Sequence, residues 1–486
     1  MTGNEFGFAL VLLGLLLGFG KWVRMKSKTS QKLFLPTSII AGGIALLLGP
    51  GVFGRLAAGL GFDGFVEGGL FTEPIMDVWR TLPGLLISVV FAALFLGERI
   101  PKAKEAVALA GPQLSLGIAM GAGQYVIGII LAVTILGPVF GLPPLVGALI
   151  EVGFEGGHGT AAGLGEMFAD LGFPEGQDLA LGLATVGVVS GVVIGIALIN
   201  WGVRTGRTIV VEEAAAMSLS EQRGVFERED QRAAAWMTTR PSSVEPLAIH
   251  FAVVSLAIII GRGLLWAFQE LEQLLWADTV EVFAFVPLFP LAMIGGIIVQ
   301  KVIDRLDREG LVDREMMLRI QGFALDLLIV SALATLSLQV IADNFVPFML
   351  LALGGILWNV TAFIVLARRM IPEFWFERGI GDLGQSLGVT ATGLILMKVA
   401  DPETKTPAYE AFGYKQLAFE PFFGGGLITA ASIPIIAQFG PFPMLAAMSS
   451  IMVAAIAIGI LRFGRRPPDP DVIARARPGY VEDRPA

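Results

Sequence analysis

A short stretch rich in glycine and hydroxyl side chains occurs twice, as Gly156-Gly157-His158-Gly159-Thr160-Ala161-Ala162-Gly163-Leu164 and as Gly388-Val389-Thr390-Ala391-Thr392-Gly393-Leu394. Each copy lies at about the same place in one of two similar hydrophobic halves. Glycine and small hydroxyl residues suit backbone that breaks, approaches a ligand and offers it dipoles. Two breaks in corresponding positions predict the binding site of a transporter.

The composition is that of a membrane protein. The 486 residues are 55% hydrophobic and 16% charged, and the mean hydropathy is +0.74, whereas soluble domains carry roughly 25% charged residues. Long continuous apolar runs predict an all-α polytopic protein and exclude the alternating pattern of a β-barrel. The absence of cysteine excludes disulfides, thiolate metal sites and cysteine nucleophiles. The expected partners are the lipid bilayer and a small solute, not nucleic acid.

Eleven segments are predicted to span the membrane as helices, and two further hydrophobic segments, 143–168 and 374–399, are interrupted by glycine and polar residues. The eleven are 6–23, 33–48, 82–96, 114–139, 179–203, 246–268, 283–303, 320–341, 346–367, 417–439 and 444–463. We expect the two interrupted segments to be re-entrant hairpins, since non-helical backbone at that depth must be buried in protein. Basic residues after the first span and at Arg462 and Arg465 then place the N-terminus outside and the C-terminus in the cytoplasm.

The repeat extends beyond the glycine-rich segments. The Pro36 to Gly43 segment parallels Pro290 to Gly296, and the helix that carries Gln124 parallels the helix that carries Asn359. Five crossings precede the second copy, so the halves should have opposite orientation. We expect two inverted-topology repeats of five transmembrane helices, each with a re-entrant hairpin, plus an extra C-terminal helix. The boundaries are 1–204, a cytoplasmic linker at 205–245, 246–440, the extra helix at 441–464 and a tail at 465–486.

The first glycine-rich segment is the sharpest local signal of a binding site. Glycines let successive N–H groups point at an anion, while unwound carbonyls and the hydroxyls of Thr160, Thr390 and Thr392 suit Na⁺. The alternative is a small-residue surface for helix packing. His158 is equally a carboxylate ligand or a residue that shapes the turn. With only two histidines, metal catalysis and an enzymatic role are not expected.

Acids and amides within apolar sequence are the next candidates. Asp326 is a candidate Na⁺ ligand or proton carrier, or else the partner of Arg319. Glu155 precedes the glycine pair and either binds a cation or faces outside water. Gln124 and Asn359 either bind substrate or hydrogen-bond the broken backbone.

The predicted substrate-binding residues are Gly156, Gly157, His158, Gly159, Thr160, Gln124, Val389, Thr390, Ala391, Thr392 and Asn359. The candidate Na⁺ ligands are Asp326, Glu155, Thr160 and Thr390.

The Gly-Gly-His-Gly-Thr motif at 156–160, the segment 388–392 and the Gln124 helix resemble the bacterial glutamate:sodium symporters over most of residues 5–440. The resemblance implies inverted five-helix domains, sodium coupling, a substrate such as L-glutamate, a homodimer, an elevator-like motion and a place in the bacterial inner membrane. The chain departs from the family at Ala391, where proline is typical, and at Thr429 and Ser432, where Asp and Asn are usual. Glu151 and Glu155 also stand where more neutral residues are usual, which leaves the exact substrate and the number of sodium ions open.

The expected function is therefore sodium-coupled symport of glutamate or a related carboxylate. A proton-coupled or exporting transporter, or a channel, is the alternative. An intramembrane hydrolase that uses His158 is the least favoured, because two symmetric hairpins do not make one asymmetric catalytic cluster.

Overall fold

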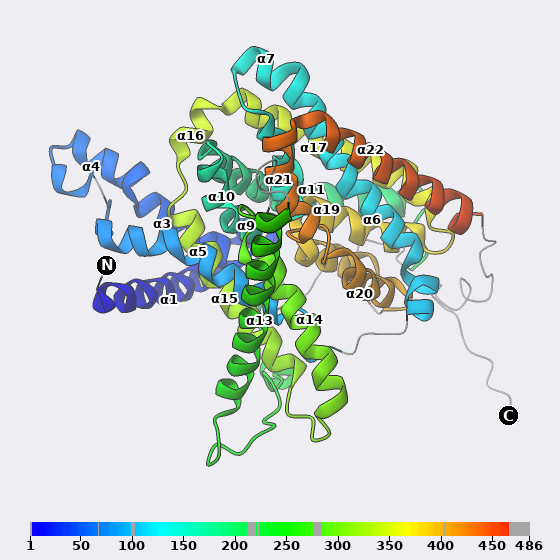
Figure 1. The fold of residues 1–486 in the computed structure, drawn as a ribbon, viewed down its shortest axis with the longest axis horizontal. Helices are drawn as coiled ribbons and strands as arrows, with labels where there is room; N and C mark the ends of the chain where they lie inside the picture. Colours follow the sequence, from blue (N-terminus) through cyan, green and yellow to red (C-terminus); the bar gives the residue numbers. More distant parts are fainter. Residues whose placement is uncertain are drawn as a thin grey trace. The chain divides into compact units, whose positions relative to one another are not determined.

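The computed structural model describes the chain except for residues 1, 67, 99–102, 211–219, 221–222, 276–282, 403 and 466–486, and it describes residues 63 and 103–108 by their backbone alone. Part of the predicted linker and nearly all of the predicted tail lie outside the described residues. Every regular element in the described ranges is a helix (Figure 1). Ten of these helices are long and apolar enough to cross a membrane. The prediction of an all-helical, multi-pass membrane protein is confirmed.

The chain forms two compact units, and each unit takes residues from both halves of the sequence. Unit 1 consists of residues 1–99, 158–181 and 220–345, and unit 2 consists of residues 100–157, 182–219 and 346–486. This division by compactness is separate from the predicted division into repeats.

The helices of unit 1 are α1 (Gly3–Lys26), α2 (Lys28–Lys32), α3 (Thr37–Leu48), α4 (Arg55–Gly59), α5 (Glu73–Ala93), α9 (Gly157–Gly163), α10 (Gly165–Asp170), α13 (Pro246–Leu275), α14 (Leu288–Leu306), α15 (Arg314–Ala334) and α16 (Leu338–Asp343). Helix α11 (Glu175–Arg204) begins in unit 1 and continues into unit 2. A π-helical turn, η1 (Pro50–Gly54), follows α3 and leads into α4.

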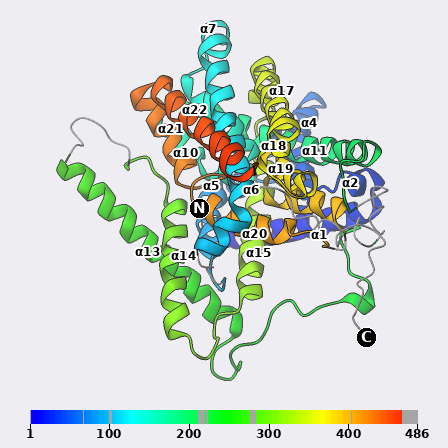
Figure 2. The same ribbon diagram turned by 90° about the vertical axis from the view of Figure 1, so that its right-hand side faces the viewer.

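Six helices of unit 1 pack in a pattern that repeats between the two halves of the sequence. Helix α3 packs on α1 and α15, while α14 packs on α13 and α5, and α5 also packs on α15. Figure 2 shows α13 and α14 side by side. Glycine permits the closest approaches: a Cβ atom at Gly42 of α3 would lie 2.7 Å from the Cβ atom of Leu333. The helix pairs that pack together are therefore the same when α1 is exchanged with α13, α3 with α14 and α5 with α15.

Helix α5 begins at Glu73, nine residues before the predicted start of that span, and contains Pro83. The extra turns are held by tertiary contacts that apolar content alone does not reveal. Trp79 is fully buried, and its Nε1–H donates to the carbonyl of Ala9 on α1 at 3.1 Å. The prediction that this helix starts at residue 82 is wrong because it followed hydropathy alone.

The helices of unit 2 are α6 (Ala103–Leu131), α7 (Gly137–Phe140), α8 (Leu149–Phe154), α17 (Phe345–Ala362), α18 (Arg368–Met370), α19 (Trp375–Ala400), α20 (Ala408–Phe419), α21 (Leu427–Phe439) and α22 (Pro441–Ile458). The 3₁₀ turn η4 (Pro144–Ala148) precedes α8. Helices α6 and α17 each end in a five-residue π-helical turn, η3 (Ala132–Leu136) and η6 (Phe363–Ala367). Helix α6 also packs along α22 (Figure 1).

Helix α19 is broken in the second glycine-rich stretch. Gly388 (φ −147°, ψ 45°) and Val389 (φ 58°, ψ 174°) leave the helical region. The two arms fold back on each other, because a Cβ atom at Gly384 in the first arm would lie 2.7 Å from the Cα atom of Gly393 in the second. Two glycines thus allow the arms to touch backbone to backbone.

The predicted single span at 417–439 is two helices, α20 and α21, and the prediction was wrong. Pro421 and three consecutive glycines lie between them, and Gly424 (φ +67°) and Gly425 (φ +102°) adopt conformations that side chains disfavour. The apolar content of the segment was correct, but the helix ends at this turn.

The backbone contact within α19 predicts the effect of a single methyl group. Gly393→Ala places a Cβ atom 2.5 Å from the carbonyl oxygen of Gly381, so the arms must separate. Overpacking of this kind costs about 1–3 kcal/mol, and we expect a lower apparent Tm in detergent. The matched control is Gly413→Ala on α20, where the added Cβ meets nothing within 4 Å. An equal Tm for Gly393→Ala and the wild type would contradict this packing.

Candidate functional site

The two sequence breaks meet within unit 2. A Cβ atom at Gly157 would overlap Cγ1 of Val389, so the first break lies directly against the second. Gly157 has a φ of +71°, and Val389 has a φ of +58°. For a β-branched residue this conformation is an outlier, and strained backbone of this kind costs about 1–3 kcal/mol and persists only where its surroundings enforce it.

The amides of Gln124 and Asn359 converge on one backbone carbonyl at the second break. Gln124 Nε2 donates to the Ser386 carbonyl at 2.7 Å, and Asn359 Nδ2 donates to the same oxygen at 3.0 Å. In an unbroken helix that oxygen would accept the N–H of Thr390, four residues on. Two side chains from corresponding helices of the two halves therefore satisfy the carbonyl that the break releases.

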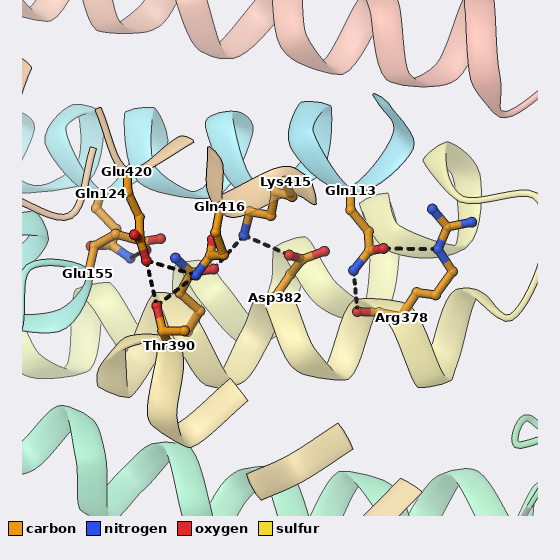
Figure 3. A network of polar contacts seen from close by, with 10 residues as sticks. Gln113, Gln124, Glu155, Arg378, Asp382, Thr390, Lys415, Gln416 and Glu420 are labelled. Atoms are coloured by element: carbon orange, nitrogen blue, oxygen red, sulfur yellow. Dashed lines mark hydrogen bonds and ion pairs between the residues drawn. The ribbon is translucent and has the colours of Figure 1, made fainter. Parts of the chain in front are cut away.

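Helix α20 contributes a buried lysine to the first arm of α19. Lys415 Nζ donates to Asp382 Oδ1 at 2.7 Å and to Gln385 Oε1 at 2.6 Å (Figure 3). Lys415 and Asp382 are both 0% exposed. The ammonium group also lies 4.6 Å from the centre of the Phe419 ring. One turn before Asp382, Arg378 donates to Gln113 Oε1 at 3.1 Å.

The same helix holds the start of the second arm. Thr390 Oγ1 donates to Glu420 Oε1 at 3.0 Å and accepts from Gln416 Nε2 at 2.6 Å (Figure 3). Helix α20 and the residue after it therefore brace both arms of α19, on either side of the break.

The two acids that precede the first break have different environments. Glu151 is fully buried and accepts three hydrogen bonds, from Tyr125 Oη at 2.6 Å, Gly424 N at 2.9 Å and Thr429 Oγ1 at 2.8 Å. Tyr125 Oη also lies 3.2 Å from Ser432 Oγ. Glu151 thus joins α6 to the turn before α21 and to α21 itself.

Glu155, by contrast, has spare hydrogen-bonding capacity. Its Oε2 accepts from Gln124 at 3.4 Å, while its buried Oε1 has no hydrogen-bond partner among the described residues. The side chain lies beside Ser386, whose Oγ is also buried without a partner there, as is Oε1 of Gln124. Asp382 Oδ2, Gln416 Oε1 and, at the start of α19, Glu377 Oε2 complete the set among the described residues of unit 2. These are all oxygen atoms, and carboxylate, amide and hydroxyl oxygens are the ligands of hard cations.

The remaining predicted residues of unit 2 vary in exposure. Gly156 is partly exposed and Ala391 is exposed, whereas Thr392 is buried. A Cβ atom at Gly388 would lie 2.7 Å from the Thr392 hydroxyl, so that hydroxyl faces the break.

Four predicted residues belong to unit 1. His158, Gly159 and Thr160 lie in the first turn of α9, and a Cβ atom at Gly159 would lie 3.2 Å from Ile87 of α5. His158 and Thr160 are buried. Asp326 on α15 is exposed and lies near the Ser38 hydroxyl.

The alternative partner proposed for Asp326 is engaged elsewhere. Arg319 forms an ion pair with Glu315, with its Nη2 3.1 Å from Glu315 Oε2. Asp326 is therefore near a hydroxyl rather than paired with Arg319, and it takes no part in the network of unit 2.

Sequence reasoning missed the residues that α20 supplies. Lys415, Gln416 and Glu420 lie in a segment interpreted as a loop and the start of a span. One signal was available: Phe412 and Phe419 stand three residues before and four residues after Lys415. On a helix that spacing puts both rings on the face of the lysine, which indicates burial.

Apolar helices broken in pairs around buried polar groups are the features of a secondary transporter, and this is the class to which the fold and site point. The chain belongs to the sodium/glutamate symporter family: a family model described as "Sodium/glutamate symporter" matches residues 81–401, about two thirds of the chain. The resemblance seen in the sequence is confirmed. Comparison with curated protein sequences gave no match. Both breaks lie within the matched residues, whereas α20 follows them.

The contrast between the two acids predicts unequal effects on stability. Glu151→Gln replaces an acceptor of three hydrogen bonds with a group that has one oxygen, and hydrogen bonds to charged groups contribute about 1.5–3 kcal/mol. Glu155→Gln disturbs a single long contact. In thermal unfolding in detergent, we expect Glu151→Gln to lower the Tm by several degrees more than Glu155→Gln. The reverse order would show that Glu155 is the structural acid.

Proposed function

We propose that this protein is a sodium-coupled symporter that carries L-glutamate or a related carboxylate across the bacterial inner membrane by elevator-like alternating access. The observation that carries the proposal is the meeting of the two breaks at Gly157 and Val389, with Gln124 and Asn359 bound to the carbonyl of Ser386. In this proposal both broken segments are re-entrant hairpins.

The carboxylate of the substrate would bind at the start of the second arm of α19. The arm after Val389 begins a new run of helix, so its first N–H groups have no carbonyl partners within it. A helix N-terminus carries partial positive charge and favours an anion. The hydroxyl of Thr392 faces the same break. Gly156 and Gly157 would supply the matching backbone groups of the first break.

Sodium would bind among the unpartnered oxygens before the break. Glu155 Oε1, Gln124 Oε1 and Ser386 Oγ are buried, belong to neighbouring side chains and combine one carboxylate with two neutral oxygens. Thr390 shares its hydroxyl with Glu420 and Gln416, so its role as a sodium ligand would require it to exchange partners. Thr160 and Asp326 remain candidates for a second ion.

The two units support an elevator-like motion. Unit 2 contains both amide helices, all of α19 and the first arm of the first hairpin, and unit 1 contains the six helices with the repeated packing pattern. We propose that unit 2 carries the substrate and that unit 1 is the scaffold of two inverted repeats. The homodimer, with the N-terminus outside and the C-terminus in the cytoplasm, is part of the same proposal.

One observation favours a second candidate, proton-coupled transport. Glu155 is a buried carboxylate with an unpartnered oxygen, and such a group can carry a proton instead of binding a cation. The two modes differ in which gradient drives uptake.

We expect proteoliposomes with an inward sodium gradient to accumulate labelled glutamate or aspartate, since each net charge moved is worth about 2.3 kcal/mol per 100 mV. Thr390→Ala removes a hydroxyl at the break and should lower uptake about tenfold, the effect of about 1.4 kcal/mol. Thr160→Ala should act in the same direction.

Thr390→Ser keeps the hydroxyl and is the matched control. Glu155→Gln should raise the sodium concentration for half-maximal uptake while leaving the protein folded. Uptake that needs no sodium but follows a proton gradient would replace sodium coupling with the second candidate. Uptake of neutral amino acids alone would contradict the carboxylate substrate.

A further inference from the structure

Lys415 is a fully buried lysine in the polar centre of unit 2. Its exposed fraction is 0%, as is that of Asp382. Lysine is almost never fully buried unless its charge is paired, because an ammonium group loses its hydration. The environment of Lys415 Nζ must therefore replace that hydration.

The groups around Lys415 Nζ are those of a cation site. A carboxylate oxygen of Asp382 lies at 2.7 Å and an amide oxygen of Gln385 at 2.6 Å. The Phe419 and Phe412 rings lie at 4.6 Å and 5.3 Å from the ammonium. Carboxylate and amide oxygens are ligands that sodium also accepts, and aromatic faces attract cations.

The ammonium group of Lys415 lies close to the break in α19. Gln385 directly precedes Ser386, whose carbonyl accepts hydrogen bonds from the amides of Gln124 and Asn359. Helix α6 makes room for the lysine, because a Cβ atom at Gly117 would lie 2.5 Å from Lys415 Cε. The positive charge is thus held at the end of the first arm, beside the proposed sodium ligands.

The family model matches the residues that supply the oxygen ligands but not the residue that supplies the ammonium group. Asp382 and Gln385 lie within residues 81–401, which the family model matches, whereas Lys415 lies beyond them. The matched part of the chain supplies the oxygens, and the positive charge comes from the segment that follows. A buried ion pair that only stabilises the fold needs no such ligand set, and Asp382 Oδ2 has no hydrogen-bond partner among the described residues.

We propose that Lys415 is a tethered cation, whose ammonium group occupies a position at Asp382 and Gln385 that a coupling sodium ion could otherwise fill. The inference rests on the proposed sodium coupling and deepens it, because it sets the number of ions. With one cation position permanently filled from within the chain, the transporter binds one sodium ion fewer than its oxygen ligands could hold.

The test removes the ammonium and counts sodium ions. Lys415→Met keeps an unbranched apolar stem and leaves Asp382 and Gln385 free to bind sodium. We expect purified Lys415→Met to bind one more ²²Na⁺ per chain than the wild type, and to gain more thermal stability from added sodium. Lys398→Met, which removes a lysine from α19 outside this network, should match the wild type in both measurements.

A second substitution separates a sodium site from a structural pair. Lys415→Met combined with Asp382→Asn removes both charges, and we expect it to fold and to bind the wild-type number of sodium ions. A single variant that binds no additional sodium, or that stays unfolded at high sodium concentration while the double variant folds, would overturn the inference.

Transport measurements keep the two proposals distinguishable. If wild-type uptake follows sodium and the Lys415→Met variant couples the same number of ions per substrate, the tethered cation is wrong and the symporter stands. If wild-type uptake does not depend on sodium, the proposed coupling is wrong. The number of ²²Na⁺ ions bound per chain then still decides whether Lys415 fills a cation position.

Discussion

The structure of unit 2 depends on satisfying one backbone carbonyl. Breaking α19 at Gly388 and Val389 leaves the Ser386 carbonyl without its helical donor, and in an apolar environment such a group costs several kcal/mol. Gln124 and Asn359 both donate to it. Because these amides come from α6 and α17, which are far apart in the sequence, the break fixes both helices against α19.

The break at Gly388 and Val389 also separates two groups of side-chain contacts along α19. Before the break, side chains gather around the first arm: Glu155 and Gln124 beside Ser386, and Lys415 at Asp382. After it, Glu420 and Gln416 bind the Thr390 hydroxyl. The proposed function therefore assigns cation binding to the side chains before the break and anion binding to the backbone after it.

The sequence was sufficient to predict the class of fold and the presence of the breaks. Hydropathy predicts the helices, and glycine beside threonine at 156–160 and 388–392 predicts interruption, because both are local properties. The pairing of Gln124 with Asn359 followed from the repeat. What each amide contacts could not be predicted, because that depends on the backbone that the break exposes.

Contacts between residues that lie far apart in the sequence could not be predicted from local sequence patterns. Lys415 lies 30 residues or more from its partners Asp382 and Gln385, and no local pattern pairs it with either one. The turn before α21 was missed for a related reason. Its glycines lie inside the predicted span 417–439, while the N–H of Gly424 donates to the distant Glu151, a contact that the local sequence does not reveal.

The balance of buried charge connects the cation sites to an anionic substrate. Among the described residues of unit 2, five acids (Glu151, Glu155, Glu377, Asp382 and Asp401) are buried together with two bases, Lys415 and Arg378, so the buried groups are short of three positive charges when all are ionised. A carboxylate substrate at the second arm would be repelled by that excess, and like charges at close range in a low-dielectric interior interact strongly. Under the proposed function, a sodium ion at Glu155 reduces this excess by one charge at the acid that lies beside the break. Sodium and substrate would then bind cooperatively because the ion neutralises the acid that opposes the anion, and the same acid explains why the empty site does not attract the anion alone.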